Sequence, residues 1–118
     1  MRNSTPKRNE QYLQYIRQQR SATGNTDINI VAHHVRAGQN GGTGQKPSDY
    51  RCIPLGHIEH MTLHDMGEKS FYSMSQINHE DEIISNMLLY FASKIRDFED
   101  KSLVITGLED LLDQMYRS

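Results

Sequence analysis

The spacing of apolar residues changes several times along this chain, and each spacing predicts a different kind of element. In residues 9 to about 19 the apolar side chains recur three and four positions apart, which predicts a short amphipathic helix. Residues 27–36 are rich in β-branched side chains and predict a strand. A second apolar run, 51–55, contains Pro54, which must lie at a sheet edge or at the end of a strand. The intervening segment 38–49 holds four glycines and one proline, so the two strands are predicted to form a hairpin with a long loop.

Helical spacing returns in the second half of the chain. It begins at Gly56, and Gly67 is placed to end this helix. The longest predicted helix runs from residue 79 to about 98, with acidic residues in its first turn that complement the helix dipole. A last helix is predicted around four apolar residues, which are Leu108, Leu111, Leu112 and Met115.

These elements predict an α+β fold, in which a ββα unit follows an N-terminal helix and precedes C-terminal helices. We expect residues 1–8 to form a flexible tail and residues 9–72 to form the ββα core. Residues 73–118 are expected to pack on that core as a helical extension, because a ββα unit is too small to fold alone. The contiguous apolar residues 87–91 also predict a second packing partner for the extension, such as another copy in a homodimer.

Composition narrows the class of protein. The 118 residues are 36% hydrophobic and 24% charged, which is typical of one soluble globular domain. The longest apolar run, residues 87–92, is far shorter than the ~20 residues that cross a bilayer. The sequence does not open on a charged and then apolar segment, so we expect a cytoplasmic protein without a membrane partner. The single cysteine, Cys52, excludes an internal disulfide and is expected to be a buried structural side chain.

Charge is unevenly distributed, although the formal net charge is only −2. Residues 1–51 carry eight Lys/Arg and three Asp/Glu, whereas residues 52–118 carry five and twelve. The basic front half permits contact with a polyanion. Ordinary scatter of surface charge accounts for it equally well.

Histidines are concentrated in one part of the chain, because five of the six lie between residues 33 and 64. His60 and His64 are four apart on a predicted helix, so their rings share one face and are within reach of a single ion. Surface histidines also show this spacing. His33 and His34 are neighbours on a predicted strand and point to opposite faces, unless a strand end or a bulge brings them together. His57 is expected to be exposed.

Three segments together resemble the HNH, or ββα-metal, nuclease superfamily. They are AHHVR at 32–36, GTGQKPSD at 42–49 and IPLGHIEHMTLH at 53–64, followed by Gly67 and Phe71. Their order and spacing are most similar to the phage and prophage branch that includes the Ref-like recombination-enhancement nucleases. The lead-in segment YLQYIRQQR at 12–20 is also similar, so the resemblance covers about residues 12–72.

The chain departs from this family pattern at the cysteines. The family's Cys-x-x-Cys before the first strand is replaced by RSATG, with Arg20 and Thr23 near the cysteine positions. Gly56 stands where a cysteine is expected after Pro-Leu, and Glu59 takes the place of the first histidine of the family's HH pair, of which His60 is the second. We therefore expect no structural zinc ribbon and a single metal site.

The resemblance implies a metal-dependent endonuclease that hydrolyses the phosphodiester bonds of DNA. It implies that His34 is the general base that activates water. It also implies that one divalent ion, Mg²⁺, Mn²⁺ or Zn²⁺, is held by His33, His60 and His64. Three neutral imidazoles leave positions open for phosphate oxygens and water. A recombinase is a further candidate partner.

In this motif an Asn orients the base, and either Asp49 or Arg51 lies near its place in this chain. The Asp49 carboxylate either accepts the N–H of His34 and fixes the tautomer of the ring, or caps the start of the second strand. Arg36, Lys46 and Arg51 are candidate contacts to DNA phosphates. For Lys46 a solvated loop charge is an equal alternative.

Two other functions fit the same residues. One is a DNA-binding recombination-accessory protein without catalysis, and the other is a module whose histidines hold a structural zinc. Neither needs His34, and a structural zinc usually has four protein ligands. The nuclease is therefore the favoured hypothesis.

Overall fold

The structure is a computed structural model that describes residues 7–38, 46–97, 106–107, 109–110 and 113. Within these residues the chain is a small α+β domain with helices α1 to α4 and a two-stranded antiparallel sheet. The elements in order are α1 (Glu10–Arg17), β1 (Ile30–His34), the 3-10 helix η1 (Asp49–Arg51), β2 (Cys52–Gly56), α2 (His57–Met66), α3 (Glu68–Ser75) and α4 (His79–Asp97).

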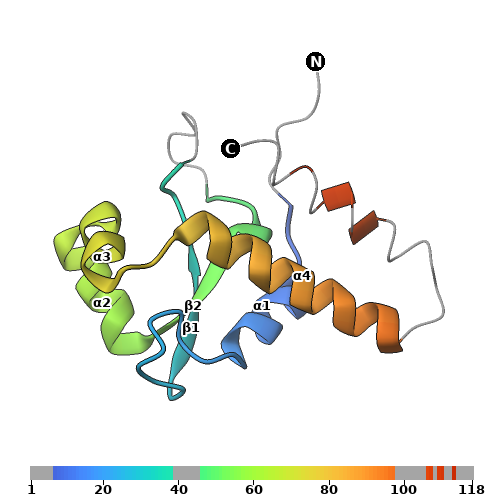
Figure 1. Cartoon of the computed structure of the whole chain (residues 1–118), viewed down its shortest axis with the longest axis horizontal. Coiled ribbons are helices and arrows are strands. Elements are labelled where there is room, and N and C mark those ends of the chain that lie inside the picture. Colours follow the sequence, from blue (N-terminus) through green and yellow to red (C-terminus); the bar gives the residue numbers. More distant parts are fainter. Residues whose placement is uncertain (1–6, 39–45, 98–105, 108, 111–112, 114–118) are drawn as a thin grey trace.

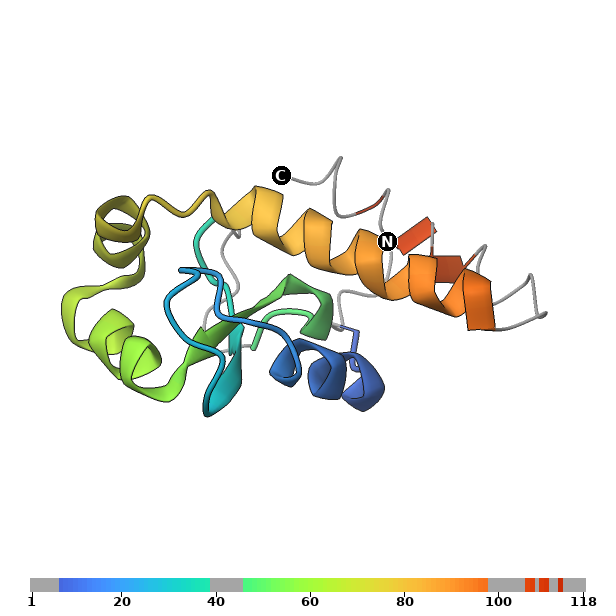
Figure 2. The same ribbon diagram turned by 60° about the horizontal axis from the view of Figure 1, so that its bottom comes forward.

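The hairpin lies at the centre of the molecule, with α1 on one side and the α2–α3 pair on the other, while α4 runs across it (Figures 1 and 2). β1 pairs with β2 from Ile30 opposite Gly56 to His34 opposite Cys52. Both strands of a two-stranded sheet are edges, so Pro54 is tolerated, and its carbonyl accepts a hydrogen bond from Ala22 N–H on the outer side. The predicted hairpin is therefore present, with β1 beginning three residues later than the strand predicted from residue 27.

The hydrophobic core lies between the hairpin and the helices. β2 is buried at all five positions, because α1, α2 and α4 all pack against it. A strand that is covered by helices on both faces must be apolar along its whole length. The fully buried side chains of this core include Tyr12 and Ile16 from α1, Ile53 and Leu55 from β2, and Ile83 and Met87 from α4. Cys52 is buried among them, as expected.

Gly67 ends α2, as the sequence predicts, and its backbone reverses the chain. Its φ of 96° and ψ of 148° lie in a region that side chains with a Cβ avoid. The reversal starts α3 at the next residue, Glu68, and folds α3 back against α2. Neither α3 nor the short helix η1 was predicted from the sequence.

Glu59, in the first turn of α2, lies beside Gly56 and the turn that contains Ser21 and Thr23. The Glu59 carboxylate accepts hydrogen bonds from the hydroxyls of Ser21 and Thr23 and from Gly56 N–H, the last at 2.8 Å. Burial raises the pKa of Glu59, but these three hydrogen bonds outweigh it and hold the pKa below its ordinary value. A carboxylate and two hydroxyls thus connect the turn before β1 to the first turn of α2.

α4 contributes one side to the core and leaves another exposed. Met87, Tyr90 and Phe91 are buried within the chain, whereas Leu88 and Leu89 are about half exposed. The homodimer predicted from this apolar run stays a prediction. Residues 106–107, 109–110 and 113 are helical, and the four residues on which the last predicted helix was based, Leu108, Leu111, Leu112 and Met115, lie outside the described residues.

Candidate metal centre

Three histidines from two elements converge beside the hairpin. His33 comes from β1, and His60 and His64 are one turn apart on α2, which packs against β1. His60 Nε2 lies 3.1 Å from His33 Nδ1 and 3.1 Å from His64 Nε2. Within the described residues these side chains form a group whose ligand atoms all lie within 4.8 Å of one another, so the group could hold a metal ion. Imidazole nitrogens suit divalent transition metals, and three of them are the usual protein share of an open site.

The burial of the three rings increases toward the strand. His33 is buried, His60 is half-buried and His64 is exposed, so the group lies between the protein interior and solvent. Burial and the neighbouring histidines lower the pKa of His60 to about 4. A metal ligand must be an unprotonated imidazole, and His60 meets this condition at neutral pH.

The ring nitrogen of His33 that faces away from the other histidines is bound by α3. His33 Nε2 lies 2.9 Å from Glu68 Oε2 and 3.1 Å from the hydroxyl of Tyr72. An ionised carboxylate only accepts hydrogen bonds, so Nε2 carries the proton and the lone pair is on Nδ1, toward His60. Glu68 and Tyr72 were not among the residues identified from sequence. The one available signal was their spacing of four on a helix, and it does not point to His33.

His34 forms a separate pair with Asp49. His34 Nε2 lies 2.9 Å from Asp49 Oδ1, and the carboxylate is almost completely buried. Asn9 N–H donates to Asp49 Oδ2 at 2.7 Å, and Arg8 Nη1 lies 3.4 Å from Oδ1. Of the two roles considered for Asp49, the structure has the contact with His34, and the capping hydrogen bond to Tyr50 N–H comes from Ser48 instead.

The electrostatic surroundings favour a neutral His34 and a charged Asp49. Burial lowers the pKa of His34, and the nearby charges of Lys46 and Arg8 lower it further, against the opposing effect of Asp49. Burial raises the pKa of Asp49, but hydrogen bonds from His34 and Asn9 N–H outweigh this and hold the pKa low. A charged Asp49 therefore accepts Nε2–H and leaves the lone pair of a neutral His34 on Nδ1.

One cavity of about 350 Å³ brings the two groups together. Its lining includes the three histidines of the metal group, His34, Glu68, Arg36 and Lys46. His34 is the last residue of β1, and the register is continuous over the whole strand, so the strand end rather than a bulge lets two neighbouring histidines line one cavity.

Arg51 lies elsewhere. Its guanidinium donates to Ala37 O at 2.8 Å and to Glu80 Oε2 at 2.9 Å, and the residue is 8% exposed. Such burial suits a structural ion pair between the end of β1 and the start of α4 rather than a contact with DNA. Arg36 and Lys46 are therefore the stronger candidates for phosphate contacts.

Two further histidines and two basic residues lie outside the lining of this cavity. His57 is exposed, as expected. His79 stacks on Tyr72 with 5.1 Å between ring centroids, while Asn78 makes the hydrogen bond to Asp81 N–H at the start of α4. Lys7 and Arg8 fall within the tail expected to be flexible, but Lys7 O accepts a hydrogen bond from Asp49 N–H and Arg8 donates to the carbonyls of Lys46 and Pro47.

Comparisons with known protein families, curated proteins and solved structures found no match to this chain. Among the described residues, no helix combines the length and apolar character needed to span a membrane. The functional interpretation therefore depends on the geometry of this cavity.

Proposed function

We propose that this chain is a metal-dependent endonuclease of the HNH type that hydrolyses DNA phosphodiester bonds. The observation that carries the proposal is the shared cavity, where a three-histidine group and a carboxylate-bound fourth histidine face the same space. The order of elements is β1, β2 and α2, with the histidines at the end of β1 and on α2. This order supports a ββα-metal motif.

The three histidines would hold one divalent ion through His33 Nδ1, His60 Nε2 and His64 Nε2. The ion would supply positive charge that neutralises the phosphate and stabilises the leaving oxygen. The exposed position of His64 keeps this side of the group open to a substrate. A structural zinc site is typically closed by a fourth protein ligand, and among the described residues the group contains only these three histidines.

His34 is the proposed general base. Its Nδ1 takes a proton from the attacking water, while Asp49 keeps the proton on Nε2 and stabilises the imidazolium that forms. The lowered pKa of His34 keeps the ring in the unprotonated, active form at neutral pH. Arg36 and Lys46 line the same cavity and are the proposed phosphate contacts.

A plasmid-nicking assay tests the proposal directly. The full chain is incubated with supercoiled plasmid and Mg²⁺, Mn²⁺ or Zn²⁺, with a chelator as the metal-free reference. We expect nicking with at least one ion and none with the chelator. His34→Ala should abolish nicking while metal binding persists, and His57→Ala is the matched control because His57 is exposed and does not line the cavity.

Other outcomes of this assay would select the alternative functions. Salt-sensitive DNA binding by the folded chain without cleavage under any ion would overturn the nuclease and favour the accessory protein. Unfolding by the chelator would favour a structural zinc. A homodimer and a recombinase partner remain predictions that the assay does not address.

A further inference from the structure

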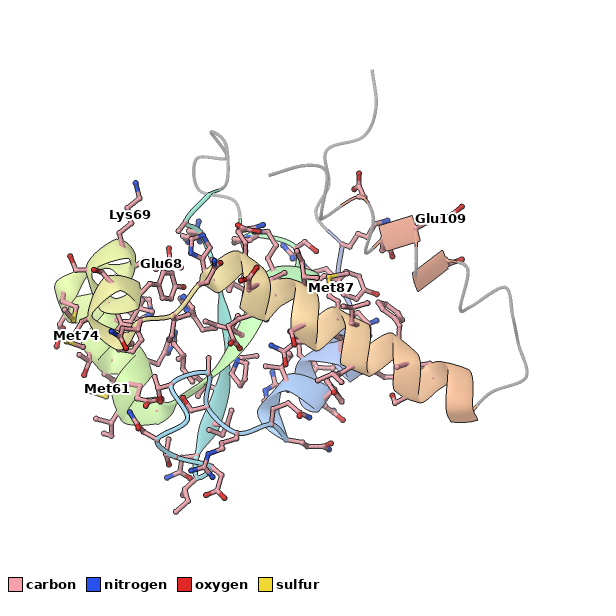
Figure 3. The ribbon with its side chains drawn as sticks, viewed as in Figure 1. Met61, Glu68, Lys69, Met74, Met87 and Glu109 are labelled. Atoms are coloured by element: carbon pink, nitrogen blue, oxygen red, sulfur yellow. The ribbon has the colours of Figure 1, made fainter. Side chains whose placement is uncertain are left out.

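Glu68 makes more hydrogen bonds than any role in starting α3 requires. Its Oε2 accepts from His33 Nε2 at 2.9 Å and from the Tyr72 hydroxyl at 2.7 Å. The same carboxylate accepts two backbone N–H groups, from Arg36 at 3.0 Å and from Ala37 at 2.9 Å. Figure 3 shows Glu68 on the side of α3 that faces the hairpin, whereas the next residue, Lys69, projects outward.

We propose that Glu68 is a positioning residue that serves two parts of the cavity at once. It fixes the nitrogen that His33 presents to the metal ion, and it holds the backbone that carries Arg36 to the same cavity. This inference rests on the metal site of the proposed function, and it adds a carboxylate that couples metal binding to the placement of a phosphate contact.

The tautomer of His33 decides which of its nitrogens can bind a metal ion. Neutral imidazole carries its proton on either nitrogen, and only the form with the proton on Nε2 leaves a lone pair on Nδ1, toward His60. A carboxylate that faces Nε2 favours this form and raises the basicity of the other nitrogen. The Glu68 carboxylate faces donors only, because the Tyr72 hydroxyl and the backbone N–H groups of Arg36 and Ala37 also donate to it, so it is placed to accept the proton on His33 Nε2.

The chain that follows β1 is held by the same carboxylate. The ladder of the hairpin ends at His34, and Val35 N–H still donates to Arg51 O. The next two N–H groups, of Arg36 and Ala37, extend beyond the ladder, and the Glu68 carboxylate accepts both. The two N–H groups that flank the Cα of Arg36 are therefore both held, which fixes the point from which the Arg36 side chain extends. Arg36 lines the cavity.

Tyr72 completes the arrangement from the next turn of α3. Its hydroxyl donates to Glu68 Oε2 and also lies 3.1 Å from His33 Nε2. The carboxylate therefore cannot rotate away from His33 without losing the hydrogen bond from Tyr72. Removing this hydroxyl should loosen Glu68 without removing its charge, which makes Tyr72→Phe the milder variant.

The test measures metal affinity and the tautomer of His33 in the full chain. Zn²⁺ affinity is obtained by competition with a chelator, and long-range ¹H–¹⁵N spectra of the metal-free protein report which ring nitrogen of His33 carries the proton. We expect the wild type to show Nε2–H. Glu68→Gln should weaken Zn²⁺ binding by about 10–100-fold, the usual effect of losing such a partner, and Tyr72→Phe should weaken it less.

Glu80→Gln is the matched control. Glu80 binds Arg51, which in turn holds Ala37 O, so this change loosens the same backbone without touching His33. We expect the Zn²⁺ affinity of Glu80→Gln to equal that of the wild type. Glu68→Gln should also bind short duplex DNA more weakly than the wild type does. Circular dichroism confirms that both variants fold.

The results separate this inference from the proposed function. Zn²⁺ affinity that is equal in wild type and Glu68→Gln, or equally reduced in Glu80→Gln, would overturn the positioning role even if the wild type cleaves DNA. If the wild type binds Zn²⁺ and Glu68→Gln binds it weakly, the positioning role stands even if no cleavage is found. A wild type that binds no divalent ion would overturn both.

Discussion

His33 and His34 are consecutive residues with the same kind of partner, yet the surroundings of the two rings differ. Each Nε2 lies 2.9 Å from a carboxylate oxygen, which belongs to Glu68 for His33 and to Asp49 for His34. In both rings the lone pair is therefore on Nδ1. The difference lies in what Nδ1 meets and in the charges nearby.

Nδ1 of His33 lies 3.1 Å from another imidazole nitrogen, in a group of three donors that suits a cation. His34 instead lies near Lys46 and Arg8, whose positive charges lower its pKa. Positive charge repels a bound cation but favours a neutral base. Nδ1 of His33 thus faces other imidazoles, whereas His34 lies near two cations, and we expect this difference to separate a metal ligand from a base.

The largest effects should come from removing each ring. His34→Ala should lower the cleavage rate by about 10²–10⁴-fold, the usual contribution of a general base, with metal affinity unchanged. His33→Ala should abolish tight Zn²⁺ binding, and with it cleavage. Cleavage rates and Zn²⁺ affinities of the two variants make the comparison, and a loss of metal binding in His34→Ala would contradict the division of roles.

Changing the two carboxylates should separate the roles with smaller effects. Asp49→Asn places an amide beside His34, which permits the tautomer with the proton on Nδ1, where no lone pair remains to accept a proton from water. We expect cleavage to fall by about 10–100-fold with normal Zn²⁺ affinity. In Glu68→Gln the Zn²⁺ affinity should fall. Parallel cleavage and competition measurements on both variants check this, and a fall in Zn²⁺ affinity in Asp49→Asn would count against it.

Of the two histidines, only His33 should be affected by a backbone change at Gly67. A Cβ at Gly67 would meet no atom within 4 Å, so Gly67→Ala acts only through the strain of its φ of 96°. We expect a loss of about 1–3 kcal/mol in the free energy of unfolding, measured with urea. Because Gly67 aims Glu68 at His33, Zn²⁺ affinity should also fall, while Gly24→Ala, at a positive φ in a distant turn, should affect stability alone.

The hairpin and α2 were predictable from sequence because their signals are local. β-branched residues mark β1, the glycine-rich loop and Pro54 mark the connection and the second strand, and Gly67 marks the end of α2. The spacing of His60 and His64 likewise follows from helix geometry alone. That His33 joins them was expected only through the family resemblance.

The contacts of Glu68 and Arg51 could not be predicted, because their partners are far away in sequence. Glu68 binds His33 across 35 positions, and a charged residue at the start of a helix ordinarily indicates nothing more than a favourable dipole interaction. Arg51 pairs with Glu80 only once α4 has packed on the hairpin, so its charge alone suggested a surface role. Long-range pairing of charged side chains leaves no periodic signal in the sequence.

The smallest expected effect is on the pH dependence of cleavage, and it tests how the surroundings of His34 set its pKa. Lowering the pKa of a base extends activity toward acid, so the acid limb of cleavage should lie below the ordinary histidine pKa of about 6.5. Arg8 is one of the cations that lower this pKa, and its guanidinium is half exposed and screened by solvent. Arg8→Gln should therefore raise the pKa of His34 slightly and move the acid limb to higher pH.

The pH profile of kcat/KM for the wild type and Arg8→Gln measures this shift, at ionic strength held constant and with saturating metal. Arg17→Gln is the matched control, because Arg17 pairs with Glu10 on the exposed face of α1 and does not line the cavity. The direction of the shift is decisive. An acid limb that moves to lower pH in Arg8→Gln, or that does not move, would mean that the positive charge of Arg8 does not lower the pKa of His34 and that the cationic surroundings do not distinguish His34 from His33.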